Sequence, residues 1–350
     1  MTSGCPETIT GNKKMNKSIV LAYRADWTVA ALPASRIDYA PLTHIAHSFA
    51  VATTSGVTFP DAKATRELIE TAHKRGAKVT LALGGADSNR ALSTLCQTVD
   101  GTRILAANIA AHIATAGYDG ADVDWEHPEN RADMSRLSLF VAELRRVLPR
   151  TKLLTMAVPA TDWNARWYDA PALLPHLDWA AVMAYDFYGS WSENAGHHAA
   201  LHPTKTGDPA LCGASAVKYW RETKRFPANK LLFGVPLYAR GFRTKAWGDA
   251  VPNPADKQIE RTYRDLGGVG KTDAATGTAT WTTENVAVIL SGDNPDTARQ
   301  KGAWARAQGC AGVFFWELSQ DLGGGKSVIR AARGGFETAT GGTVTATSVR

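Results

Sequence analysis

The sequence predicts a single (β/α)8 barrel with a small α+β insertion after the seventh strand. Eight short, apolar, β-rich runs recur along the chain, and helical patterns separate them. Most of these runs are almost continuously apolar, which is typical of strands buried on both faces of a parallel sheet. The length of 350 residues suits one barrel of about 250 residues with insertions. An open doubly wound sheet is disfavoured, because no GxGxxG turn follows the first run.

The strands are expected from the first run, "SIVLAY", to the last, "AGVFFW". They span residues 18–23, 44–50, 78–83, 120–125, 153–158, 179–185, 231–238 and 311–316. Four helices are expected between them from apolar spacing and stop signals. They span residues 61–76, 102–117, 131–149 and 294–309, three ending in glycine and one in proline.

The chain is expected to form one barrel domain over residues 18–333. The insertion, residues 241–293, contains "QIERTYRDL" and "TATWTTENVAVIL", enough for a small α+β unit. Residues 1–17 are polar, and residues 334–350 are rich in Gly and Thr without periodicity. Both ends are therefore expected to be flexible.

Composition argues against several function classes. The formal net charge is +6, and Lys and Arg are scattered, so we expect no nucleic-acid partner. No apolar stretch approaches the roughly 20 residues of a membrane helix, so we expect no membrane partner. The four cysteines lack CxxC spacing, and "GGVGKT" has Asp265 where a phosphate loop needs glycine. We therefore expect no zinc site at the cysteines and no phosphate-binding loop. We also expect no cofactor and a monomeric protein.

The segment "YDGADVDWEHPEN" carries carboxylates at Asp119, Asp122, Asp124 and Glu126. Side chains alternate along a strand, so the last three project to the same side, and Asp119 is out of phase. In a barrel, that side is the interior, and catalytic residues come from the carboxyl ends of the strands. Mutual repulsion should keep at least one carboxyl protonated, as a general acid requires. The spacing alone also fits a metal site or a structural hydrogen-bond network.

The motif D-G-x-D-x-D-x-E resembles the signature of family 18 glycoside hydrolases, the chitinases and their relatives. Other segments resemble strand ends of that family, in order, from about residue 18 to 322. They are "YRADW", "PLTHIAHSFA", "LALGG", "MAYDFYGSW", "GVPLYARGF" and "GVFFWELSQD". An insertion after the seventh strand is also a feature of the family.

The resemblance implies a mechanism with a single acid and no metal ion. Glu126 would protonate the glycosidic oxygen, and the 2-acetamido group of the substrate would be the nucleophile, forming an oxazolinium ion. Asp124 would hold the acetamido N–H. Asp122 would lie deeper and exchange a proton with Asp124. Asp119 is expected to be structural.

The resemblance also assigns residues that bind sugar. Tyr185 and Asp186 would contact the acetamido group, with Met183 beneath the pocket. Tyr238 and Arg240 would line the opposite wall and bind hydroxyl groups.

Aromatic residues are expected to stack on the sugars. Trp316 would form the pocket floor, and Trp27 and Trp191 would hold outer sugars on opposite sides of the cleavage point. Tyr23 would support the inner aspartates. The other tryptophans, Trp163 among them, receive no role in binding.

Three positions depart from the family pattern. Ala82 replaces a serine whose hydroxyl supports the inner aspartates, so Tyr23 should be left alone in that task. Ala86 replaces a tryptophan platform. His127 replaces a tyrosine after the acid; it could depress the pKa of Glu126 when charged, but a side chain facing away into a loop is the usual arrangement.

The resulting expectation is a retaining, endo-acting chitinase that cleaves β-1,4 bonds between N-acetylglucosamine units. Its partners would be chitin or N-acetylglucosamine oligosaccharides. Two alternatives stay open: an endo-β-N-acetylglucosaminidase acting on N-glycans, and a non-catalytic chitin-binding lectin. The resemblance implies an extracellular location, although residues 1–17 show no apolar signal core.

Overall fold

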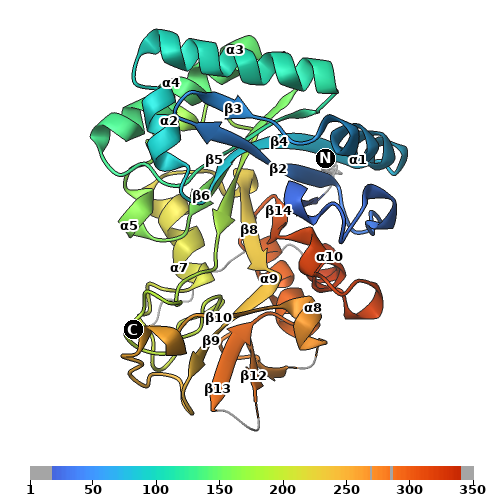
Figure 1. Ribbon diagram of the computed structural model, residues 1–350. Coiled ribbons are helices and arrows are strands. Elements are labelled where there is room, and N and C mark those ends of the chain that lie inside the picture. Colours follow the sequence, from blue (N-terminus) through green and yellow to red (C-terminus); the bar gives the residue numbers. More distant parts are fainter. Residues whose placement is uncertain (1–17, 269, 284–286, 340–350) are drawn as a thin grey trace, which may run out of the picture.

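A computed structural model describes residues 18–268, 270–283 and 287–339. Eight parallel strands form a closed barrel, because β1 pairs with both β2 and β14. The barrel strands are β1 (Ile19–Ala25), β2 (His44–Thr53), β4 (Lys78–Gly85), β5 (Gly120–Trp125), β6 (Leu153–Pro159), β7 (Trp179–Met183), β8 (Leu231–Pro236) and β14 (Gly312–Trp316). The predicted (β/α)8 barrel is confirmed (Figure 1).

Helices cover the outside of the barrel. They are α1 (Ala62–Lys74), α2 (Asn89–Leu95), α3 (Val99–Ala116), α4 (Arg131–Val147), α5 (Asp162–Ala165), α6 (Ala170–Leu173), α7 (Gly213–Lys218), α9 (Pro295–Ala307) and α10 (Val328–Thr338). Side-chain caps explain where several begin: Asp61, Asn130 and Asn294 each accept a hydrogen bond from a backbone N–H of the first turn. Gly117 ends α3 in the left-handed conformation, with φ of 86°.

Some local features differ from the prediction. Residues 334–338 were expected in a flexible end, but they continue α10, whose apolar face buries Val328, Ile329 and Phe336. Residues 340–350 and residues 1–17 lie outside the described part of the chain. A short strand that the sequence did not indicate, β3 (Gly56–Thr58), forms a hairpin with the end of β2.

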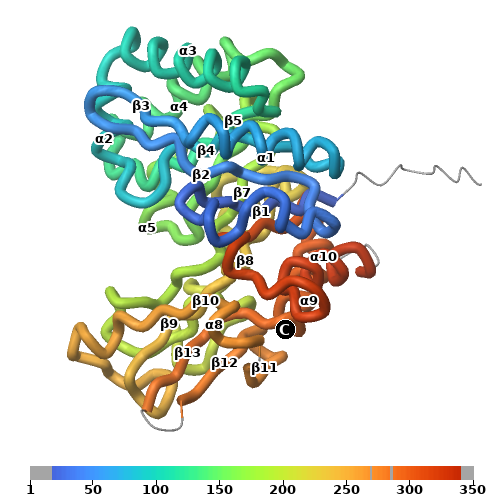
Figure 2. Tube along the Cα trace, turned by 45° about the vertical axis from the view of Figure 1, so that its right-hand side comes forward, coloured from blue at the N-terminus to red at the C-terminus, as the bar shows by residue number. Residues whose placement is uncertain are grey.

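A second, antiparallel sheet is inserted between β8 and α9. Its order is β10 (Ile259–Thr262), β9 (Tyr238–Arg243), β13 (Val288–Gly292), β12 (Thr278–Thr282) and β11 (Lys271–Asp273), and α8 (Tyr263–Leu266) follows β10. The sheet lies at one side of the barrel in both views (Figures 1 and 2). The predicted seventh strand ran to residue 238, but the barrel strand ends at Pro236, and Tyr238 begins β9.

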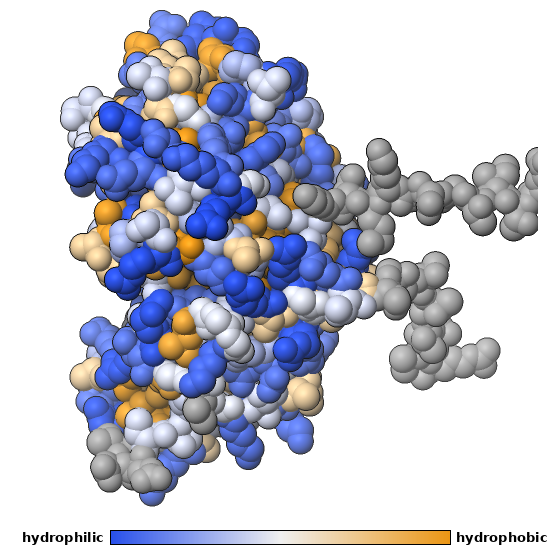
Figure 3. Space-filling view, turned by 90° about the vertical axis from the view of Figure 1, so that its right-hand side faces the viewer, coloured by the Kyte–Doolittle hydropathy of each residue, from blue (hydrophilic) through white to orange (hydrophobic). Residues whose placement is uncertain are grey.

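The apolar core has two main parts. One lies between the strands and the outer helices, and the other fills the barrel interior with residues such as Leu21, Leu232 and Phe314. Among the described residues, no helix is long and apolar enough to cross a membrane. The face in Figure 3 is mostly hydrophilic, with hydrophobic residues scattered over it in small groups.

Candidate active site

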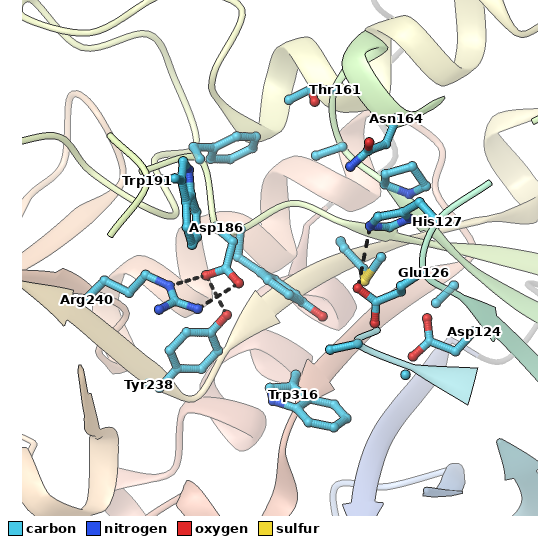
Figure 4. Close-up of a pocket in the computed structure, with 18 of the residues that line it drawn as sticks. Asp124, Glu126, His127, Thr161, Asn164, Asp186, Trp191, Tyr238, Arg240 and Trp316 are labelled. Carbon is cyan, nitrogen blue, oxygen red and sulfur yellow. Dashed lines mark hydrogen bonds and ion pairs between the residues drawn. The ribbon is translucent and has the colours of Figure 1, made fainter. Parts of the chain in front are cut away.

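Three carboxyl groups run in line from the barrel interior to its mouth along β5. Asp122 and Asp124 are buried, whereas Val123 and Trp125 belong to the core that faces the helices. Glu126 follows the strand and lies beside Asp124 in the pocket (Figure 4). The alternation of side chains therefore separates the two faces of this strand as the sequence predicted.

Asp119 lies before β5 and apart from this row. Its carboxylate accepts a hydrogen bond of 2.7 Å from the backbone N–H of Val79 and pairs with His73 at 2.8 Å. Asp119 thus ties the start of β5 to β4 and α1, and it does not line the pocket.

Asp122 has two hydroxyl donors. Tyr23 Oη donates to Oδ2 at 2.5 Å, and Thr155 Oγ1 donates to Oδ1 at 2.5 Å. The expectation that Tyr23 acts alone is therefore wrong. Thr155 on β6 lies directly across from Asp122, on the side opposite Ala82 of β4, and supplies the second hydroxyl. Burial raises the pKa of Asp122, although both hydrogen bonds oppose the shift.

Asp124 and Glu126 both favour the protonated form. Burial raises the pKa of Asp124 well above its usual value, and the charges of Glu126 and Asp122 add to the rise. Burial also raises the pKa of Glu126 to about 7, with further contributions from Asp186 and Asp87. Oδ1 of Asp124 is buried and has no hydrogen-bond partner among the described residues. The pair can thus offer one acidic proton and one free acceptor oxygen.

His127 faces the pocket, contrary to the usual arrangement that the sequence suggested. Its Nε2 lies 3.5 Å from Oε2 of Glu126, and its Nδ1 lies 3.0 Å from the hydroxyl of Tyr168. Burial lowers the pKa of His127 to about 4, so the ring is neutral at most pH values. His127 therefore does not depress the pKa of Glu126 as a charged imidazolium would.

The opposite wall is built around Asp186. Arg240 binds it in a bidentate manner at 2.6 and 3.0 Å, and the hydroxyl of Tyr238 donates at 2.7 Å (Figure 4). His198 approaches the same carboxylate at 3.3 Å from behind. Burial acts to raise the pKa of Asp186, but the hydrogen bonds and charges of His198 and Arg240 outweigh it and hold the pKa below its usual range. Tyr238 and Arg240 come from β9, so the inserted sheet completes the barrel pocket.

Tyr185 lies between the two walls. Its ring makes an edge contact with Tyr238 at 6.2 Å and a tilted contact with Phe314 at 6.1 Å. Burial raises the pKa of Tyr185 well above its usual value, as do the surrounding carboxylates, so the phenol keeps its proton and can donate. Met183, two residues earlier, also lines the pocket.

An aromatic cluster forms the floor. Trp316, at the end of β14, packs against Tyr23 at 5.7 Å and stacks on Phe49 at 5.7 Å between ring centres. Trp27 adjoins it at 6.3 Å and is 67% exposed. Phe49 was not predicted; it lies in "HIAHSFA", whose apolar letters do not show which side chain reaches the mouth.

Two further tryptophans lie at the rim. Trp191 is 57% exposed, and the guanidinium of Arg240 lies 5.1 Å from its ring centre. Trp163, which the sequence analysis left without a role in binding, lines the pocket and is 76% exposed. It lies in α5, just beyond the carboxyl end of β6, and no motif marked it.

The two walls, the aromatic floor and the rim border one cavity of about 1080 Å³. Every predicted catalytic or binding residue other than Asp122 lines it, and Asp122 lies directly beneath. The predicted residues that line it are Tyr23, Trp27, Asp124, Glu126, Met183, Tyr185, Asp186, Trp191, Tyr238, Arg240 and Trp316.

Within the described part of the chain, no cluster of His, Cys, Asp and Glu has the geometry of a metal site. The neighbouring histidines serve different contacts. His197 bonds to Ser291 Oγ at 2.9 Å and packs on Trp247, whereas His198 supports Asp186.

Comparison with known families identifies the family of this chain. The model of glycosyl hydrolases family 18 matches residues 19–321. The chain belongs to that family. The family 18 chain is 30% identical over 285 residues to an endochitinase of Brugia malayi, a match covering 72% of this chain and 55% of that protein. It thus spans about half the length of that relative.

Solved structures show the same fold. The second catalytic domain of the Group II chitinase of Ostrinia furnacalis, solved as a mutant with a penta-N-acetylchitooligosaccharide, has a TM-score of 0.82 and 24% identity, covering 90% of this chain and 95% of that one. A family 18 chitinase of Cycas revoluta, solved with (GlcNAc)3, has a TM-score of 0.80 and 23% identity, covering 91% and 100%.

Proposed function

We propose that this family 18 chain is a retaining, endo-acting chitinase that uses the substrate's own acetamido group as nucleophile. The observation that carries the proposal is the pairing of Glu126 with Asp124. Glu126 holds a proton up to a pH of about 7, and Asp124 keeps a buried, unpartnered oxygen beside it. Both lie above an aromatic floor suited to the C–H face of a sugar ring.

In the first step, Glu126 donates its proton to the glycosidic oxygen while the acetamido carbonyl oxygen attacks C1. The C1–O bond breaks, the shortened chain leaves as an alcohol, and an oxazolinium ion forms. In the second step, the Glu126 carboxylate takes a proton from water, which attacks C1 from the face that the leaving group occupied. The product therefore keeps the β configuration.

The acetamido group would be held from two sides. Oδ1 of Asp124 is free to accept its N–H, and the charge of Asp124 would stabilise the ring cation. The phenol of Tyr185 would donate to the carbonyl oxygen. Asp122, fixed by Tyr23 and Thr155, would share a proton with Asp124 as the charge on the latter changes.

The rim supports binding of a chain longer than the reacting sugars. Trp27 and Trp191 are both exposed and border the same cavity. Trp27 joins the floor cluster, whereas Trp191 packs on Arg240 of the opposite wall. The solved structures that resemble this chain include complexes with three- and five-sugar oligosaccharides, which is compatible with such an extended groove.

The function is tested by incubating the protein with N-acetylglucosamine tetramer to hexamer and reading products by mass spectrometry. Proton NMR of the fresh products identifies the anomer. We expect cleavage at internal bonds, with products in the β configuration. We expect no cleavage of fully deacetylated oligomers, which lack the acetamido nucleophile. α products would contradict the mechanism. Cleavage of N-glycans alone would favour the endo-β-N-acetylglucosaminidase, and binding without any cleavage would favour a lectin.

The pH dependence of kcat/KM should have an alkaline limb near pH 7. Glu126 must be protonated to donate, and its pKa is raised to about 7, so activity is present below this value and is lost as pH rises through it. Above the pKa, kcat/KM should fall about tenfold per pH unit. A limb close to pH 4, the value of an ordinary carboxyl, would show that another group is the acid.

Replacing Trp163 by alanine should weaken binding of long substrates. The exposed indole offers a stacking surface at the rim, and its loss should raise KM for the hexamer about tenfold, with a smaller effect for the trimer. Steady-state kinetics with both oligomers measure this. Ile104→Ala is the matched control, because Ile104 is similarly exposed on α3, outside the pocket. Equal KM values for wild type and Trp163→Ala would exclude the contact.

A further inference from the structure

The ring of His127 is held in one tautomer by its neighbours. The hydroxyl of Tyr168 donates its single proton to the backbone carbonyl of Trp125 at 2.7 Å. The same hydroxyl lies 3.0 Å from Nδ1 of His127. Because the proton of Tyr168 is already used, Nδ1 of His127 must be the donor in this contact. A neutral imidazole with a proton on Nδ1 has a lone pair on Nε2.

That lone pair faces the acid. Nε2 of His127 lies 3.5 Å from Oε2 of Glu126, a separation that a small side-chain rotation closes to a hydrogen bond. A deprotonated carboxylate would repel the lone pair, whereas a protonated carboxyl can donate to it. His127 therefore interacts favourably with only one state of Glu126, the state needed for the first step.

We propose that His127 is a positioning residue that holds the acidic proton of Glu126 on its unprotonated Nε2, in the tautomer that Tyr168 selects. This inference rests on the proposed role of Glu126 as the acid. The proton stays on the carboxyl and is only hydrogen-bonded to the ring. When substrate binds, the glycosidic oxygen replaces Nε2 as the acceptor.

Other groups also face Glu126, but none of them carries an unprotonated ring nitrogen. They come from four segments: Asp87 after β4, Asp124 on β5, Tyr168 before α6, and Tyr185 with Asp186 after β7. The two phenols keep their protons, and Asp186 is already bound by Arg240 and Tyr238. Among the described residues that line the cavity, His127 is the one histidine. It is therefore the neutral nitrogen base that lies within 3.5 Å of the acid.

The first test needs no substrate. Nitrogen-15 NMR of histidine-labelled protein distinguishes protonated from unprotonated ring nitrogens, and His127→Phe assigns the signals. The proposal expects Nδ1 of His127 to carry the proton and Nε2 to be bare near pH 6. In Tyr168→Phe, the preference for this tautomer should weaken. A proton on Nε2 in the wild type, or on both nitrogens, would overturn the proposal.

The second test reads the pKa of Glu126 directly. The carboxyl carbon-13 signal of Glu126, assigned by its absence in Glu126→Gln, is titrated in wild type and in His127→Phe, which keeps an aromatic ring but has no acceptor. Loss of one hydrogen bond to the protonated form should lower the midpoint by about half to one pH unit. An upward shift would mean that His127 acts as a cation, and an unchanged midpoint would mean no contact; either result overturns the proposal.

The alkaline limb of kcat/KM should move down by the same amount in His127→Phe. His176→Phe is the matched control, because His176 lies just before β7, at the opposite end of the barrel, and should leave the profile unchanged. If the wild type cleaves no oligosaccharide, the proposed function is wrong. Both NMR tests then still show whether His127 accepts the proton of Glu126, because they need no substrate. If wild type cleaves and the limb does not move, only the role of His127 fails.

Discussion

Replacing Glu126 by glutamine is expected to lower kcat on N-acetylglucosamine oligomers by about 10³-fold or more. Glutamine keeps the size of the side chain but has no acidic proton, and proton donation to a leaving group contributes about 10²–10⁴-fold. In the second step, the amide also cannot take a proton from water. Mass spectrometry of the hexamer digest, with wild type and variant at equal concentration, measures the loss. A decrease of less than about tenfold would mean that Glu126 is not the acid.

The stability of Glu126→Gln shows whether the variant is correctly folded. The pKa of Glu126 is raised in the folded protein, so its contribution to stability is present at low pH and is lost as pH rises through about 7. Glutamine avoids this loss. Glu126→Gln should therefore be stabilised relative to wild type by on the order of 2 kcal/mol near pH 8.5, with little difference near pH 4. Thermal unfolding at the two pH values checks this, and retained binding of the hexamer shows that the groove is intact.

Asp124→Asn is expected to lower kcat by about 10²–10³-fold with a much smaller change in KM. The amide can still accept the acetamido N–H through its oxygen, so binding should persist. It cannot supply the negative charge that would stabilise the proposed oxazolinium cation, and a single electrostatic contact of this kind is worth about 10²–10³ in rate. Initial rates over a range of hexamer concentrations separate the two parameters.

Asp119→Asn is the matched control for Asp124→Asn. Both are aspartates of the same motif, but Asp119 bonds to Val79 and His73 at the far end of the strand. Its replacement should leave kcat within about twofold and affect stability instead. If Asp124→Asn raised KM alone, the residue would serve only to bind substrate. If both variants lost kcat equally, the effect would come from the fold of β5 and not from its catalytic face.

The barrel and the row of carboxyl groups on β5 could both be predicted from the local sequence. Long apolar runs separated by helical patterns indicated the barrel, because a parallel sheet covered on both sides needs strands without polar faces. The row of Asp122, Asp124 and Glu126 followed from the two-residue period of a strand. Each of these inferences depends on residues adjacent in the chain, where geometry is set by the backbone itself.

Contacts between residues on different strands could not be predicted from this local geometry. Thr155 supports Asp122 because the register of β5 against β6 places them side by side, and its predicted strand gave no sign of this role. Phe49 and Trp163 border the cavity for a similar reason: each lies near the end of a different strand, and only barrel closure brings those ends together. The end of the seventh strand was misplaced because Pro236 stops the ladder and the chain continues directly into β9.

The sequence by itself therefore determined the barrel, the strand that carries the row of carboxyl groups and the residue types that face its mouth, because periodicity and motif spacing are properties of neighbouring residues. Tertiary structure alone decided the electrostatic state of the site. The raised pKa of Glu126 results from burial and from carboxylates on other segments. The tautomer of His127 depends on Tyr168, which lies 41 residues away in the chain. Such effects arise from distance and dielectric in three dimensions, which the order of residues does not display.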